Sequence, residues 1–140
     1  MFVTIKEIWQ MLMNLIRVPT IVNSTTTANW NSGVATSGQP GADLFTLGTP
    51  GEWFKLSEIY LGLYAFNAAA TVTVRVYEEI LGAERLVMDE DYIVAAEPDI
   101  VFIFWFWEIE MYGQIRIEIF SDQAADDGLA APYEYRYKEL

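Results

Sequence analysis

The sequence predicts an all-β fold: an antiparallel, jelly-roll-like β-sandwich with an N-terminal helix and a long extended arm. Residues 71–77 and 114–120 carry the main signal, because β-branched apolar residues alternate with polar ones in both segments. A period of two is typical of strands with one buried and one wet face. About eight short strands, with turn residues roughly every 8–12 positions, indicate a sandwich or jelly roll. The predicted inward rows are Val72, Val74 and Val76 on one strand and Ile115, Ile117 and Ile119 on the other.

The chain of 140 residues has the length of one ordinary domain. We divide it into an N-terminal helix and arm at residues 1–51 and a β-sandwich domain at residues 52–140. Residues 22–51 are rich in Thr, Asn, Gly and Pro, which predicts a long loop or extended arm. Loops beyond about 15 residues are usually functional or disordered. If this segment contacts neighbouring subunits, deleting residues 1–51 is expected to abolish the assembly of those subunits while leaving the sandwich folded.

The charge balance argues against several classes of partner. The chain has 20 Asp and Glu residues against 8 Lys and Arg, a formal net charge of −12. This charge repels phosphate backbones and anionic membrane surfaces, so we expect neither nucleic acid nor membrane as a partner. The longest apolar run is also too short to span a bilayer, which takes ~20 residues. An acidic shell around an apolar content of 53% fits a protein that must stay soluble before it assembles.

Residues that carry common chemistry are scarce. The chain has no Cys and no His, which removes thiolate nucleophiles, zinc–thiolate sites and the commonest general base. Glu108 and Glu110 would lie on one face of a strand, with their Cα atoms about 6.6 Å apart. Their carboxyl groups could then have the separation of about 5–9 Å that glycoside hydrolases use. Any two acids at this spacing would do so, and we predict no catalytic residue, no cofactor and no enzyme activity. The acidic loops of the chain are expected to be exposed to solvent; the alternative is that their carboxylates bind Ca²⁺. The residues concerned are Asp89, Glu90, Asp91, Asp122, Asp126 and Asp127.

Residues 4–17 are predicted to form an amphipathic helix. Thr4 and Glu7 have the spacing of a capping box, and Pro19 ends the pattern. The apolar stripe could pack into the domain's own core or dock on a neighbouring subunit, as helix-in-groove contacts do. Membrane anchoring ranks third because the polar face carries few cations. The stripe consists of Ile5, Ile8, Trp9, Leu12, Leu15 and Ile16.

Residues 100–107 form a run that is apolar on both faces of the expected strand. One interpretation is a central strand covered by the helix or the arm. Another is an interface with a second subunit, where aromatic residues tend to be anchors. A third is a row of rings that stacks on sugars. The predicted interface residues are Ile5, Ile8, Trp9, Leu12, Leu15, Phe102, Phe104, Trp105 and Phe106.

Arg75 and Glu118 project from the faces opposite the Val and Ile rows. If their strands are antiparallel neighbours, the two side chains can pair across them. We expect this pair to be exposed, and an exposed pair contributes only about 0.2–1 kcal/mol. It would then set strand register more than stability.

The segments 71–79, 114–118, 121–128 and 132–137 together resemble small β-sandwich virion proteins of tailed viruses, encoded among head and tail genes. In the last segment, aromatic residues alternate with charged ones. The resemblance spans about residues 52–137 and rests on pattern. It implies a non-enzymatic role as a capsid decoration or minor head–tail protein in the virion. Its expected partners are copies of itself and a capsid or tail protein lattice. The alternative is a carbohydrate-binding or adhesion module that uses exposed Trp and Tyr.

Overall fold

The computed structural model describes residues 3–15 and 19–139, and it describes the backbone but not the side chains of residues 13–15 and 104–108. In chain order the elements are α1 (Ile5–Leu15), β1 (Thr20–Asn29), β2 (Ala42–Leu47), β3 (Trp53–Gly62), the 3₁₀ turn η1 (Leu63–Ala65), β4 (Thr71–Ile80), β5 (Ala83–Ile93), β6 (Ile100–Tyr112), β7 (Ile115–Ser121), the 3₁₀ turn η2 (Ala124–Asp126) and β8 (Asp127–Glu139).

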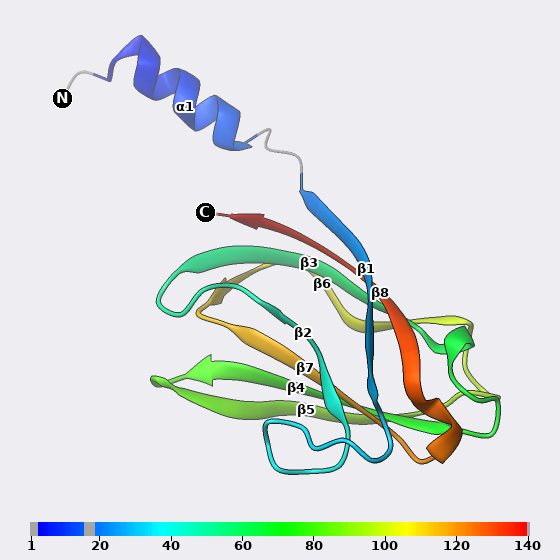
Figure 1. The fold of residues 1–140 in the computed structure, drawn as a ribbon. Coiled ribbons are helices and arrows are strands. Elements are labelled where there is room, and N and C mark those ends of the chain that lie inside the picture. The colour runs from blue at the N-terminus through cyan, green and yellow to red at the C-terminus, as the bar shows by residue number, and fades with distance from the viewer. Residues whose placement is uncertain (1–2, 16–18, 140) are drawn as a thin grey trace.

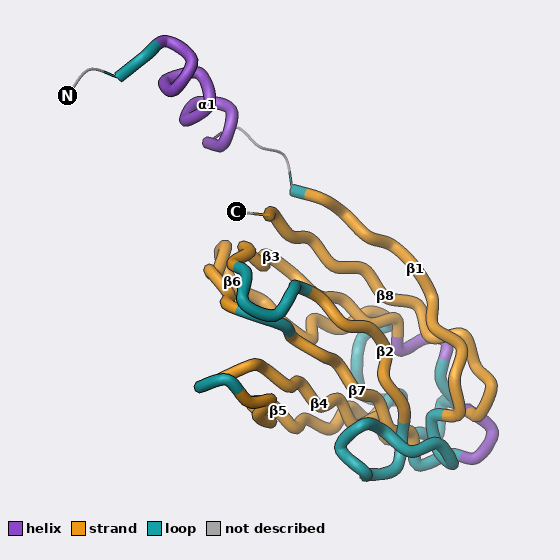
Figure 2. The backbone as a smooth tube through the Cα atoms, turned by 60° about the vertical axis from the view of Figure 1, so that its left-hand side comes forward, coloured by secondary structure: helices purple, strands orange, loops and turns teal. Residues whose placement is uncertain are grey.

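The strands form two four-stranded antiparallel sheets that pack face to face (Figure 1). One sheet has the order β1-β8-β3-β6 and the other the order β2-β7-β4-β5. Apart from the β4–β5 hairpin, each strand is followed by a strand of the opposite sheet, which is the arrangement of a jelly roll. Figure 2 shows the same two layers from another direction. The prediction of an all-β sandwich is confirmed.

The core lies between the two sheets and contains both predicted inward rows. β4 and β7 are antiparallel neighbours, with Val74 opposite Ile119 and Val76 opposite Ile117. All six residues of the two rows are at most 1% exposed. Leu56, Ile59 and Leu61 of β3 face them from the other sheet and are also fully buried. Burying a side chain of this size stabilises the fold by ~1.5–3 kcal/mol.

Most of β1 and all of β2 lie within the segment predicted as a long loop or arm, so the prediction for residues 22–51 is wrong over residues 22–29 and 42–47, while residues 30–41 and 48–51 do form loops. β1 pairs along its whole length with β8, and β2 pairs with β7. The Thr26 hydroxyl of β1 donates to the Leu44 carbonyl of β2 at 2.6 Å, which links the edges of the two sheets. The boundary expected at residue 51 therefore lies between β2 and β3 of one sandwich. Deleting residues 1–51 would remove a strand from each sheet.

The connection from β1 to β2 begins at Trp30, whose side chain is fully buried. Its indole N–H donates to the Leu129 carbonyl at 2.8 Å, and its ring meets Phe66 edge-on with centroids 6.3 Å apart. The connection then crosses the outer face of the β2-β7-β4-β5 sheet. At Gly41, where φ is +115°, an added Cβ would lie 2.3 Å from the Ile119 carbonyl oxygen. Only glycine lets the loop backbone pass this close to β7.

Trp30→Ala should lower the free energy of unfolding by about 3–5 kcal/mol, because it opens a large cavity in the core. Urea denaturation followed by circular dichroism measures the loss. Trp53→Ala is the matched control, since the Trp53 residue is 54% exposed and its removal should cost much less. Equal losses in the two variants would contradict the core position of Trp30.

Candidate interaction surface

α1 begins with the predicted capping box. The Thr4 backbone N–H donates to Glu7 Oε2 at 2.7 Å, and the Glu7 N–H donates to Thr4 Oγ1 at 3.2 Å. These reciprocal bonds satisfy two of the N–H groups that a helix leaves without partners at its start. The hydrogen bond from the Thr4 backbone, followed by that from its hydroxyl, lowers the pKa of Glu7. The helix end is thus fixed by its own sequence.

The apolar face of α1 is exposed to solvent. Ile5 is 87% and Trp9 63% exposed, and Ile8 and Leu12 are each about half exposed, at 48% and 49%. In both Figure 1 and Figure 2 the helix stands apart from the sheets. The interpretation that this stripe packs into the domain's own core is therefore wrong for these four residues. Docking of this stripe on another subunit stays a prediction. The structure does not describe the side chain of Leu15, the fifth predicted interface residue of the helix.

The aromatic run forms much of β6, which lies at the edge of its sheet and pairs with β3. The interpretation of the run as a central strand is therefore wrong. Val101 and Ile103 point into the core and are 5% and 4% exposed. Phe102 points the other way, is 51% exposed and lies against Tyr60 with ring centroids 4.7 Å apart. The structure describes only the backbone, and not the side chains, of the other predicted interface residues of this strand: Phe104, Trp105 and Phe106.

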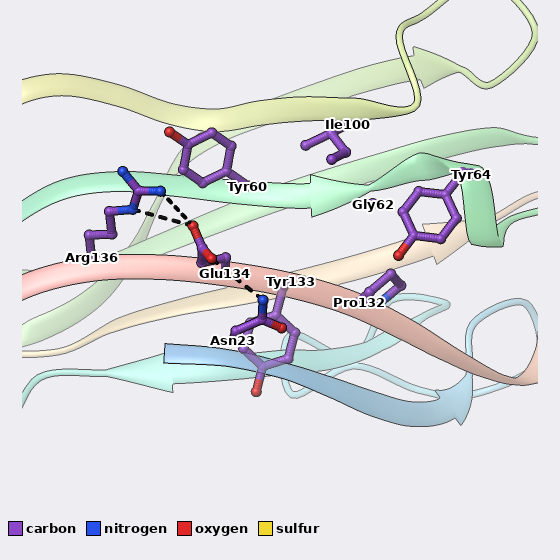
Figure 3. A pocket seen from close by; sticks show the side chains of 9 residues that line it. All are labelled: Asn23, Tyr60, Gly62, Tyr64, Ile100, Pro132, Tyr133, Glu134 and Arg136. Atoms are coloured by element: carbon purple, nitrogen blue, oxygen red, sulfur yellow. Dashed lines mark hydrogen bonds and ion pairs between the residues drawn. The ribbon is translucent and has the colours of Figure 1, made fainter. Parts of the chain in front are cut away.

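A shallow pocket of about 300 Å³ lies on the outer face of the β1-β8-β3-β6 sheet (Figure 3). All four strands of the sheet contribute to its lining, and Tyr64 of η1 adds a ring at one end. The β-ladder register explains the grouping: Glu134 of β8 lies opposite both Asn23 of β1 and Tyr60 of β3. Sequence reasoning missed this pocket.

A network of charges fixes the polar end of the pocket. Arg136 forms ion pairs with Glu134 at 2.9 Å and with Glu58 at 3.1 Å. The Tyr60 hydroxyl donates to Glu58 at 2.7 Å. Burial, followed by this hydrogen bond, raises the pKa of Tyr60, and the hydrogen bond to Glu134 raises the pKa of Arg136. At neutral pH the phenol therefore keeps its proton and the guanidinium keeps its charge.

On the opposite sheet, the predicted register of Arg75 and Glu118 is confirmed, because the two residues are direct partners across β4 and β7. The expected ion pair between their side chains is wrong: Glu118 pairs with Arg116, and Arg75 Nε lies 4.0 Å from Asp89. The expectation that they are exposed is wrong: Arg75 is 8% and Glu118 0% exposed. The β1–β2 loop covers them. Ser37 donates its N–H and its hydroxyl to Glu118 at 3.1 and 2.9 Å, and Arg75 donates to the Pro40 carbonyl at 3.1 Å.

Arg116 is the centre of the buried charge on this face. It donates to Asp43 at 2.8 Å and also binds Glu118 and Glu84, and its guanidinium lies 4.4 Å from the centre of the Tyr77 ring. The hydrogen bonds that Arg116 donates to Glu84 are the main cause that raises the pKa of Arg116, followed by those it donates to Glu118 and Asp43. The cluster reaches the β1–β2 loop through Glu118, which accepts from the Ser37 N–H and hydroxyl.

The acidic residues of the β7–β8 connection bind backbone groups. Asp126 accepts from the Asn67 N–H at 2.9 Å and from the Ser121 hydroxyl at 2.5 Å. Asp127 accepts from the N–H groups of Asn31 and Ser32 at 2.8 and 3.1 Å. Within the part of the chain that the structure describes, no three His, Cys, Asp or Glu side chains gather so as to hold a metal ion.

The two carboxylates weighed for catalysis lie on β6, where the Glu108 side chain is not described and Glu110 is exposed opposite Lys55. Comparison with protein-family models, curated proteins and solved structures finds no match to this chain. No helix in residues 3–15 and 19–139 is long and apolar enough to cross a membrane.

Arg116→Met should lower the free energy of unfolding by about 3–5 kcal/mol, because it leaves the Glu118 carboxylate buried without its cation. Urea denaturation at pH 7 measures the loss, and the double variant Arg116→Met/Glu118→Met should recover much of it. Arg136→Met is the control on the other sheet, where the half-exposed arginine should contribute at most about 1 kcal/mol. If Arg116→Met lowers the free energy of unfolding no more than Arg136→Met does, the pairing of Arg116 with the buried Glu118 does not stabilise the fold.

Asp127 should make stability depend on pH. The Ser32 hydroxyl, with the backbone N–H groups of Asn31 and Ser32, lowers the pKa of Asp127 below its value in the unfolded chain. The ionised Asp127 therefore contributes its full stabilisation above the pKa of an aspartate in the unfolded chain, about 3.9. This contribution is lost as the pH falls through the lower pKa that Asp127 has in the folded protein. Asp127→Asn should therefore have a lower urea midpoint than the wild type at pH 7, and the difference should shrink below about pH 4. The exposed Asp99→Asn is the control, and a difference for Asp127→Asn that does not change with pH would refute this role.

Proposed function

We propose that this protein is a non-enzymatic structural subunit of a larger assembly built from copies of itself, and that the assembly is a virion. Its role there would be that of a capsid decoration or minor head–tail protein on a capsid or tail lattice. The observation that supports this most is the exposed apolar face of α1, which stands apart from a sandwich whose own core is fully packed (Figure 1).

An uncovered α1 is energetically unfavourable. A helix of 11 residues is marginal in water, where isolated helices need about 12–15 residues or more. Most helical stability comes from packing the apolar face, and burying a side chain such as Ile8 or Leu12 contributes ~1.5–3 kcal/mol. Trp9 adds the kind of residue that anchors interfaces. A contact that covers this face would therefore stabilise both the helix and the assembly.

The neighbour's β6 edge is the surface we assign to the helix. β6 has 13 residues and lies at the edge of its sheet, with Phe102 exposed on its outer face. Long apolar edge strands invite association unless something covers them. Because α1 and β6 are different patches, their contact joins two copies reciprocally in a closed dimer or joins many copies head to tail in a ring or a filament. Such assemblies fit the repeated positions of a virion component.

Three further features support the proposal. Jelly rolls of eight strands recur in viral capsid domains, although lectin domains and cupins share the fold. The sequence pattern resembles small virion proteins of tailed viruses. A net charge of −12 also keeps the separate subunits apart until specific apolar contacts form.

Trp9→Asp should weaken self-assembly at least about tenfold, because it removes the aromatic anchor and places a charge on the docking face. Gln10→Asp is the matched control: it introduces the same residue and charge one position away, on the polar face, and assembly should persist. Light scattering after size-exclusion chromatography over a concentration series measures both variants. A chain reduced to residues 19–140 should fold and stay monomeric. Equal assembly of Trp9→Asp and wild type would contradict the proposal.

A further inference from the structure

The outer-face pocket combines apolar rings with a floor that has no side chain (Figure 3). Tyr64 is 60% exposed at one end, and Tyr60 lies at the other. Between them is Gly62, where an added Cβ would come within 2.6 Å of Pro132 Cγ and 2.8 Å of Tyr64 Cε1. A side chain at this position would fill the hollow. The pocket is therefore open because β3 carries a glycine there, and its walls offer flat apolar faces.

Polar groups on one side of these rings are held in place by one another. Glu134 accepts from Arg136 at 2.9 Å and lies 3.5 Å from the Asn23 amide nitrogen. Glu58 accepts from Tyr60 and pairs with the other side of the Arg136 guanidinium. Carboxylate oxygens accept hydrogen bonds, whereas the amide and the guanidinium donate them. A ligand here meets acceptors and donors side by side in positions fixed before it binds.

The charge of this network selects against anions. A single guanidinium lies between two carboxylates, so the set of Arg136, Glu134 and Glu58 has a net charge of −1, and the whole chain carries −12. Phosphate, sulfate or carboxylate groups would be repelled. A neutral ligand rich in hydroxyl groups can donate to the carboxylates, accept from the amide and place a C–H face on the exposed Tyr64 ring.

We propose that this pocket binds a neutral saccharide on the outer face of the β1-β8-β3-β6 sheet. Its volume of about 300 Å³ is at the small end of ligand pockets, which suits one or two sugar rings at the end of a longer glycan. The inference goes beyond the assembly role and does not depend on it, because saccharide binding needs no second copy of the chain. The two surfaces adjoin, since Ile100 of β6 lines the pocket and Phe102 lies against Tyr60. A subunit with both surfaces would attach an assembly to a glycan.

The test uses the full chain on an array of neutral, sialylated and sulfated oligosaccharides, followed by NMR titration with the strongest neutral oligosaccharide. We expect binding to neutral glycans, with chemical-shift changes at the amides of Gly62, Tyr64 and Glu134. Tyr64→Ala should weaken this binding about tenfold because a stacking ring is lost. Tyr112→Ala is the matched control: Tyr112 is 47% exposed on the same sheet but lies outside the pocket.

Three results would overturn the inference. One is the absence of binding to any neutral glycan at millimolar concentration. Another is binding restricted to sialylated or sulfated glycans, which the charge of the pocket excludes. The third is equal affinity of Tyr64→Ala and Tyr112→Ala, which would place the site elsewhere. Because Tyr64 is exposed in a 3₁₀ turn, its truncation should leave the fold intact, and the unchanged NMR spectrum of the remaining residues checks this point.

Discussion

The register between β4 and β7 is the constraint on which the rest of the structure depends. It places Val74 and Ile119 opposite each other in the core and, on the reverse face, Arg75 opposite Glu118. A shift of one residue would turn the charged row inward and the apolar row outward. The β1–β2 loop then closes over the charged row, where the Ser37 N–H donates to Glu118 and the Pro40 carbonyl accepts from Arg75. One pairing thus fixes the core, the loop and the positions of the edge strands.

The alternating strands, the capping box and the Arg75–Glu118 register could be predicted because each is encoded by a short pattern or a pair of strong strands. β1 could not be predicted by periodicity, because its residues are mostly polar and exposed, as befits an edge strand. Its run of three Thr residues was the available signal, since β-branched residues favour strands. The burial of Trp30 depends on Leu129 and Phe66, which are far away in the sequence, and no local pattern indicates it.

The two interaction surfaces differ in the same way. The apolar stripe of α1 is a helical period and is visible in the sequence. The outer-face pocket exists because Asn23, Tyr60 and Glu134 come from three strands whose register brings them into one row. Only the order of strands in the jelly roll reveals that grouping.

The docking of α1 on a second copy is tested most directly by hydrogen–deuterium exchange of the α1 amides, residues 5–15, measured as a function of protein concentration. An undocked helix of this length opens readily, and its amides exchange fast. We predict that protection of these amides rises with concentration, while the amides of β4 and β7 stay protected throughout. If α1 exchanges at the unprotected rate at every concentration, the helix does not dock on a second copy and the protein is not the self-assembling subunit described here.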